Sequence, residues 1–212
     1  MINTPQELYL SILAFKADII STICTLHKPC SVHPLCSNNS STEVLNFDKV
    51  EKELAKGKRS AMPSCDGVSL SKDNSVFCFV EIKGWKKFVD YNIANEFPSI
   101  SEVEKQKIEE KAASYNLKGK LEHSIANCEE ISKQRNVFTN IPYIYVIVTD
   151  IEKEKNAIED FAVNLSSLAE TSSVWTICDN SMLQQMNKMD SAIKKVYTHC
   201  QDFDACIAEI HA

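Results

Sequence analysis

The segment 76–83, Val-Phe-Cys-Phe-Val-Glu-Ile-Lys, constrains the fold most, because it predicts a buried β-strand that ends in two charges. Side chains alternate between the two faces of a strand, so Phe77, Phe79, Glu81 and Lys83 are expected on one face. Burying a charge without a partner is unfavourable by several kcal/mol. We therefore expect Glu81 and Lys83 to belong to a functional site.

A second strand is expected just upstream, at 65–70, and the polar residues 71–75 between the two strands favour a turn. The two strands then form an antiparallel hairpin, with Asp66 across from Val80 and Glu81. This register brings both carboxylates to one end of the hairpin. A slip of one residue would move each carboxylate to the other face.

Helices and strands alternate along the rest of the chain. The apolar run 141–148 predicts a central strand covered on both faces, and a further strand is expected at 173–178. Segment 85–87 is expected to be a loop. Helices are expected at 5–26, 42–54, 101–115, from there to about 135, at 154–169 and from 181 onwards. We predict an α/β fold with a mixed central β-sheet flanked by helices, in a single domain of residues 1–212.

The pairing of Asp66 with Glu81 predicts a cation between them, because two neighbouring carboxylates repel each other. Mg²⁺ prefers carboxylate oxygens, waters and phosphate oxygens, and it can polarise a phosphodiester and hold an attacking water. Lys83 would orient that water or neutralise charge in the transition state. The predicted site is thus Asp66 and Glu81 as metal ligands, with Lys83 as a further catalytic residue.

Asp66, followed after fourteen residues by Glu81-Ile82-Lys83, resembles the signature of the PD-(D/E)XK nuclease superfamily. The resemblance implies a restriction-endonuclease-like core of order αβββαβ within 42–148. Residues 1–41 would add an N-terminal helix and a Cys/His loop, and 149–212 a C-terminal α/β extension. It also implies an Mg²⁺-dependent endonuclease, with Mn²⁺ as a substitute. The chain departs from the pattern in having Cys65 before the aspartate.

The family also suggests supporting residues elsewhere in the chain. Its members often carry another acidic residue on the first core helix, for which Glu43, Glu51 and Glu53 are the candidates. In some members a polar residue on the helix after the motif supports the site, which points to Lys120 and Ser124. Domains of this kind serve in restriction, repair and defence against phage.

Basic residues near the motif predict contacts with nucleic-acid phosphates, although the net charge of the chain is -6. Trp85, directly after the motif strand, is expected either to stack on a base or to pack in the core. DNA is the favoured substrate over RNA. The expected phosphate-binding residues are Lys58, Arg59, Lys86, Lys87 and Lys120.

The chain has nine cysteines and no secretion signal, which favours a reducing cytoplasm over a disulfide framework. No run of eighteen apolar residues is present, so no membrane span is expected. Between Cys24 and Cys36, Cys and His alternate at every third residue. Zinc binding there is an alternative to buried or free thiols, although the spacing fits no common zinc module.

Two other classes of function are consistent with the sequence. A binding or scaffold protein could keep the restriction-endonuclease-like fold without catalysis, as part of a homodimer or a larger complex. It would bind no metal and would tolerate loss of Lys83. A zinc-stabilised interaction module would instead require metal in the Cys24–Cys36 loop.

Overall fold

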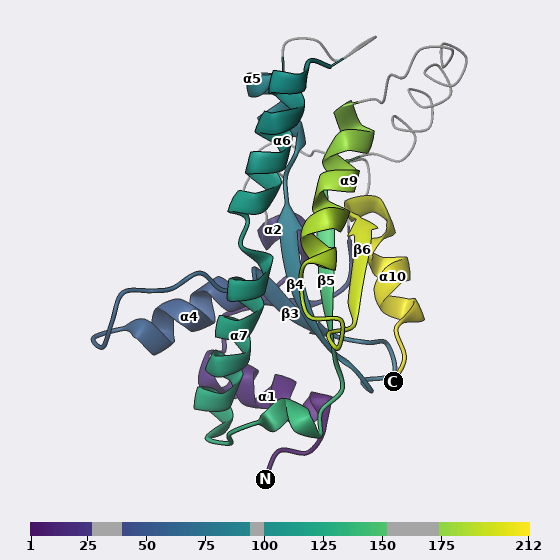
Figure 1. Cartoon of the computed structure of the whole chain (residues 1–212). Helices are drawn as coiled ribbons and strands as arrows, with labels where there is room; N and C mark the ends of the chain where they lie inside the picture. The colour runs from purple at the N-terminus through teal and green to yellow at the C-terminus, as the bar shows by residue number, and fades with distance from the viewer. Residues whose placement is uncertain (27–39, 94–99, 152–173) are drawn as a thin grey trace.

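The computed structural model describes residues 1–26, 40–93, 100–151 and 174–212, which form a six-stranded mixed sheet with helices packed against it (Figure 1). Strands β1 to β4 are antiparallel neighbours, and β4, β5 and β6 run parallel. In sheet order the strands are β1 Ile20–Ser21, β2 Val44–Asn46, β3 Gly67–Leu70, β4 Phe77–Lys83, β5 Tyr143–Thr149 and β6 Lys195–His199. The expected α/β class with a mixed central sheet is confirmed.

Helices α1, α4, α6 and α7 each begin after a residue whose side chain accepts a hydrogen bond from a backbone N–H of the first turn. Thr4 with Glu7, and Ser101 with Glu104, form capping boxes at the starts of α1 and α6.

Among the described residues, none of the helices has the length and apolar character needed to span a membrane. The helices are α1 Pro5–Phe15, α2 Ile23–Leu26, α4 Phe47–Ala55, α5 Lys86–Asn92, α6 Glu102–Ser114, α7 Leu117–Ser132, α9 Val174–Asn187 and α10 Phe203–Glu209, with short 3-10 turns at Val137–Thr139 and Cys200–Asp202.

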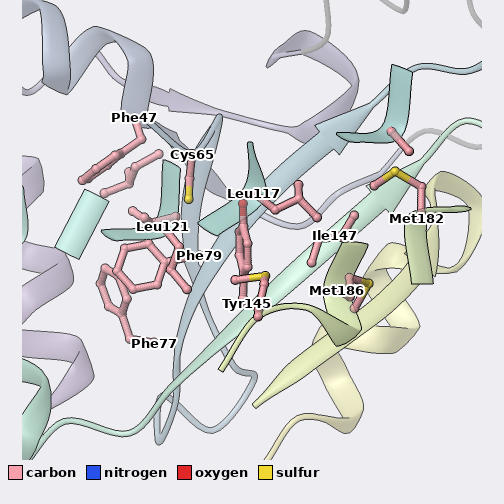
Figure 2. Close-up of a cluster of buried hydrophobic side chains, with 14 of the residues drawn as sticks. Phe47, Cys65, Phe77, Phe79, Leu117, Leu121, Tyr145, Ile147, Met182 and Met186 are labelled. Atoms are coloured by element: carbon pink, nitrogen blue, oxygen red, sulfur yellow. The ribbon is translucent and has the colours of Figure 1, made fainter. Parts of the chain in front are cut away.

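Strand β4 lies at the centre of the molecule and is buried along its whole length, and β5 is buried from Ile144 onwards. Phe77 and Phe79 face a large apolar cluster built with helices α1, α6, α7 and α9, part of which is drawn in Figure 2. Val80 and Ile82 face a smaller cluster with α2 and α10. Both faces of β4 and β5 are therefore covered, as expected for the apolar runs that form them.

The N-terminal helix is shorter than expected. The sequence predicts a helix over 5–26, but α1 ends at Phe15 and β1 follows, pairing Ile20 with Leu45 of β2. The predicted helix 42–54 likewise begins only at Phe47, after β2. Segment 85–87 was expected as a loop, but Lys86 opens α5. In the first two cases, pairing with a neighbouring strand prevails over helical spacing of apolar residues.

The C-terminal part also differs from the expectation. Segment 173–178 was expected as a strand, but from Val174 the chain forms α9. The last strand is instead β6, inside the region expected to be helical from 181 onwards. The apolar face of α9 carries Cys178, Met182 and Met186, which pack against the sheet. A short apolar run fits a strand or a buried helix equally well, which explains the error. The predicted helix 154–169 lies outside the described residues.

Gly67, the first residue of β3, sits where the backbone of the hairpin meets the preceding strand. A Cβ atom at this position would lie 2.4 Å from Val44 Cγ1 and 3.0 Å from Leu26 Cδ1. Only the absence of a side chain allows β3 to pack this closely. The position of the residue before it, Asp66, therefore depends on a glycine.

Candidate active site

The hairpin brings Asp66 and Glu81 together. Gly67 pairs with Val80, so Asp66 comes opposite Glu81, the register expected from the sequence. The amide of Ile82 donates a hydrogen bond of 2.6 Å to Asp66 Oδ2, and the Asp66 carbonyl accepts from the amide of Phe47 at 3.0 Å. The Asp66 carboxylate is thus fixed at the end of the hairpin through Oδ2. Its other oxygen, Oδ1, takes no part in this hydrogen bond.

Two lysines converge on Glu81. Lys83, two residues along the same face of β4, contacts Glu81 Oε1 directly. Lys120 Nζ reaches the same oxygen from α7 at 2.6 Å and lies 4.0 Å from Asp66 Oδ1. The Glu81 side chain is completely buried. The expected placement of Glu81 and Lys83 on one face therefore holds, and Lys120 adds a second ammonium group.

Burial and charge act in opposite directions at this cluster. Burial raises the pKa of Glu81, and Asp66 adds to the rise, while Lys83 and Lys120 oppose it. Burial by itself lowers the pKa of Lys120, but the carboxylates of Glu81 and Asp66 raise it above its ordinary value. The two carboxylates therefore favour the charged form of Lys120.

One oxygen of the cluster has no partner. Both lysines contact Glu81 Oε1, whereas the buried Oε2 forms no hydrogen bond with any residue the structure describes. Mg²⁺ is commonly held by one or two carboxylates, with waters and substrate phosphates completing its shell. The described ranges contain no group of three or more His, Cys, Asp or Glu that could hold a metal. Asp66 and Glu81 thus fit a two-carboxylate ion site and not a closed protein cage.

A third carboxylate near Asp66 was not predicted. Burial raises the pKa of Asp48, in the first turn of α4, and the charge of Asp66 raises it further. Ser64 donates a long contact of 3.5 Å to Asp48 Oδ1. The cap residue Asn46 is the sequence signal that could have located it, because that cap fixes the helix start.

The three glutamates expected as supporting acids lie elsewhere. Glu43 accepts a hydrogen bond of 2.5 Å from the Tyr9 hydroxyl, and Glu53 forms ion pairs with Lys16 and Lys56. Glu51 accepts hydrogen bonds from Arg59, Asn127 and the Met62 amide. The helix starts five residues later than predicted, so Glu43 lies before β2 and outside α4.

Helix α7 supports the hairpin at two points, as expected for Lys120 and Ser124. The amide of Cys65 donates to Ser124 Oγ at 2.8 Å, one residue before Asp66. One turn earlier on the helix, Lys120 reaches Glu81. The ring of Tyr115, between α6 and α7, lies 4.9 Å from Lys83 Nζ and covers that lysine.

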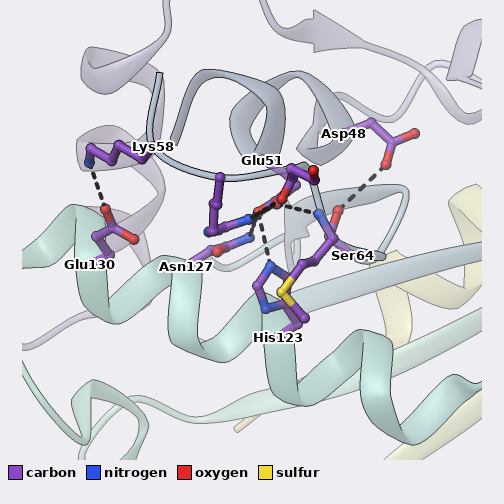
Figure 3. Close-up of polar contacts among 10 residues, drawn as sticks. Asp48, Glu51, Lys58, Ser64, His123, Asn127 and Glu130 are labelled. Atoms are coloured by element: carbon purple, nitrogen blue, oxygen red, sulfur yellow. Dashed lines mark hydrogen bonds and ion pairs between the residues drawn. The ribbon is translucent and has the colours of Figure 1, made fainter. Parts of the chain in front are cut away.

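Glu51 is the centre of a second polar cluster, between α4 and α7 (Figure 3). Its carboxylate accepts from both Arg59 nitrogens, from the Met62 amide at 2.7 Å and from Asn127 Nδ2 at 2.8 Å, and it contacts His123 Nε2 at 3.0 Å. Only 2% of the side chain is exposed. The cluster fastens the segment leading to Asp66 onto the helix that carries Lys120.

We expect part of the stability of the protein to be lost in acid through Glu51. Burial alone raises the pKa of Glu51, but its hydrogen bonds lower it to about 2, below the ordinary 4.5. A lowered pKa in the folded state stabilises the fold above about pH 4.5, and this stabilisation disappears as the pH falls towards about 2. Urea unfolding between pH 6 and pH 2.5 should show a shallower pH dependence in Glu51→Gln than in the wild type. Parallel curves would contradict this role.

The expected phosphate-binding residues are not gathered in one place. Lys120 lies at the site, but Lys58 pairs with Glu130 at 3.1 Å and Arg59 is bound to Glu51. Lys86 and Lys87 open α5, directly after β4. Of the five residues, Lys120 contributes a positive charge at the site itself. Lys86 and Lys87 contribute positive charge beyond the end of β4, at the start of α5.

Other predicted residues are structural or undescribed. Trp85 is fully buried and packs edge-on against Phe88 and Tyr115, which fits the core interpretation and not base stacking. Of the Cys24–Cys36 segment, the structure describes only Cys24 to Leu26, so the zinc hypothesis lies outside the described residues.

Comparison of the chain with protein-family models, curated proteins and solved structures finds no match. The chemistry of Asp66, Glu81, Lys83 and Lys120 is therefore the basis on which a function is assigned.

Proposed function

We propose that this protein is a metal-dependent endonuclease that hydrolyses phosphodiester bonds of nucleic acid, with DNA as the favoured substrate. The observation that carries the proposal is the pairing of Asp66 with Glu81 across the hairpin, with the buried Glu81 Oε2 lacking a partner among the residues that the structure describes. A divalent cation would satisfy that oxygen and offset the repulsion between the two carboxylates.

The strand order also supports a restriction-endonuclease-like core. Strands β2, β3 and β4 are consecutive antiparallel neighbours, and β5 returns parallel to β4 after helices α6 and α7. Asp66 precedes the second of these strands, and Glu81 and Lys83 end the third. This is the placement that the PD-(D/E)XK resemblance implies. Within 42–148 the order departs from the expected αβββαβ, because α4 lies between β2 and β3 and does not precede the three strands; β6 would be an addition to that core.

Each residue has a role in such a site. Asp66 and Glu81 would hold Mg²⁺ or Mn²⁺, which when bound polarises the phosphodiester and lowers the pKa of an attacking water. Lys83, held against Glu81 and covered by Tyr115, places a fixed positive charge where negative charge develops on the phosphate. The Ile82 amide keeps the Asp66 carboxylate in place through the hydrogen bond to Oδ2.

One observation favours a second candidate, a non-catalytic binding or scaffold protein. Lys83 and Lys120 already neutralise Glu81 without any metal, and no three-residue metal group is found in the described residues. In that case the cluster would be a structural ion-pair network. It would bind no divalent ion and support no hydrolysis.

Cleavage assays on plasmid, linear duplex and single-stranded DNA, and on RNA, test the proposal. We expect cleavage with Mg²⁺ or Mn²⁺, no cleavage with EDTA, and recovery when the metal is restored. DNA should be cut faster than RNA. Absence of cleavage on every substrate, together with no Mn²⁺ binding by calorimetry, would favour the scaffold. Cleavage that persists in EDTA would contradict the proposed chemistry.

A further inference from the structure

The ammonium group of Lys120 takes the place of a cation between the carboxylates of the candidate site. Its Nζ lies 2.6 Å from Glu81 Oε1 and 4.0 Å from Asp66 Oδ1. The Lys120 side chain is 18% exposed, so water screens its charge only in part. A positive charge at this point offsets the repulsion between Asp66 and Glu81, as a bound metal would.

We propose that Lys120 is an internal counter-ion, which occupies the cation position of the metal-free site and is displaced when a divalent ion binds. The inference rests on the proposed metal-dependent function and adds a regulatory step to it. The affinity of the site for a metal ion would then be set by competition between the ion and the ammonium group of Lys120. The displaced ammonium would be set free at the edge of the site, where a substrate phosphate would lie.

The two lysines differ in how firmly they are held. Lys83 belongs to β4, and its ammonium lies 4.9 Å from the centre of the Tyr115 ring. Lys120 projects from α7 with its side chain 18% exposed, against 9% for Lys83, and of the two lysines it is the one that lies within 4.0 Å of an Asp66 oxygen. An ion entering between Asp66 and Glu81 therefore meets Lys120 and leaves Lys83 in place.

The unequal use of the Glu81 oxygens is the second observation. Both ammonium groups contact Oε1, and the fully buried Oε2 has no hydrogen-bond partner in the described part of the chain. An ordinary buried ion-pair network uses both oxygens of a carboxylate, because an unpartnered buried acceptor is unfavourable. Oε2 thus provides a first point of attachment for an ion before Lys120 leaves Oε1.

Mn²⁺ titration of the full chain tests the competition. Lys120→Met removes the charge but keeps much of the stem, and we expect it to bind Mn²⁺ roughly tenfold or more tightly than the wild type. Lys120→Arg keeps the charge and should show no such gain. Lys118→Met is the matched control, because Lys118 lies on the same helix with its side chain 64% exposed and pairs with Glu122. Its affinity should stay close to that of the wild type.

Brief acetylation of lysines, read by peptide mass spectrometry, tests the displacement directly. We expect Mn²⁺ to raise the labelling of Lys120 severalfold and to leave that of Lys118 unchanged. If the wild type binds Mn²⁺ but Lys120→Met binds no tighter than Lys118→Met, or if labelling of Lys120 does not rise, the counter-ion role is wrong and the metal site stands. If neither the wild type nor Lys120→Met binds Mn²⁺, both proposals fail.

Discussion

Replacing Lys83 with methionine is expected to lower the rate of metal-dependent cleavage roughly 10²- to 10³-fold, the usual effect of removing one charge-stabilising group. Glu81 keeps its ion pair with Lys120 in this variant, so no uncompensated buried carboxylate is created. Methionine also fills most of the space of the lysine stem beneath Tyr115. The fold and the ability to bind Mn²⁺ should therefore be retained while single-turnover cleavage slows.

The control for this variant is Lys118→Met, which removes the same charge from a position on α7 whose side chain is 64% exposed. Its cleavage rate should fall by no more than a few-fold. Equal losses of cleavage rate in both variants would mean that Lys83 acts only through the overall electrostatic field of the protein. Full activity of Lys83→Met would contradict its assignment as a catalytic residue and would favour a structural role for the ion pair.

Replacing Glu51 with alanine is expected to destabilise the protein by about 3–5 kcal/mol, the usual effect of breaking a buried, hydrogen-bonded charge pair. The variant leaves Arg59, His123, Asn127 and the Met62 amide without their common acceptor. Urea unfolding followed by circular dichroism measures the change. Because the cluster anchors the segment before Asp66, the rate of cleavage should fall as well, even at urea concentrations too low to unfold the protein.

Glu53→Ala is the matched control, two residues further along the same helix. Glu53 is 36% exposed and its ion pairs with Lys16 and Lys56 are longer than 3.5 Å. Exposed pairs of this kind contribute about 0–1 kcal/mol. A similar loss of stability in both variants would show that helix α4, and not the buried cluster, is what the substitutions disturb.

The hairpin and the pairing of its two carboxylates could be predicted because their signals are local. Alternation along 76–83 and the turn residues 71–75 fix the register, and the register alone sets Asp66 against Glu81. The buried strand near 141–148 was equally clear from its apolarity. These features depend on residues close in sequence, where side-chain period and turn chemistry act directly.

The parts that could not be predicted depend on contacts between distant segments. Strands β1 and β2 have only two and three residues and exist because β1 pairs with β2 and β2 pairs with β3. Their presence shifts the start of α4 and brings Asp48, not a glutamate, towards Asp66. The Glu51 cluster joins residues as far as seventy-six positions apart, a separation at which no sequence pattern gives a signal.

The close packing at Gly67 limits how this sequence can diverge. Any side chain at position 67 would displace β3 from Val44 and Leu26, and with it the neighbouring Asp66. A descendant of this protein could keep Asp66, Glu81 and Lys83 and still lose the separation between its carboxylates. Under the proposed function, such a descendant would be inactive although every reactive group is intact, so the three residues alone would not identify an active protein.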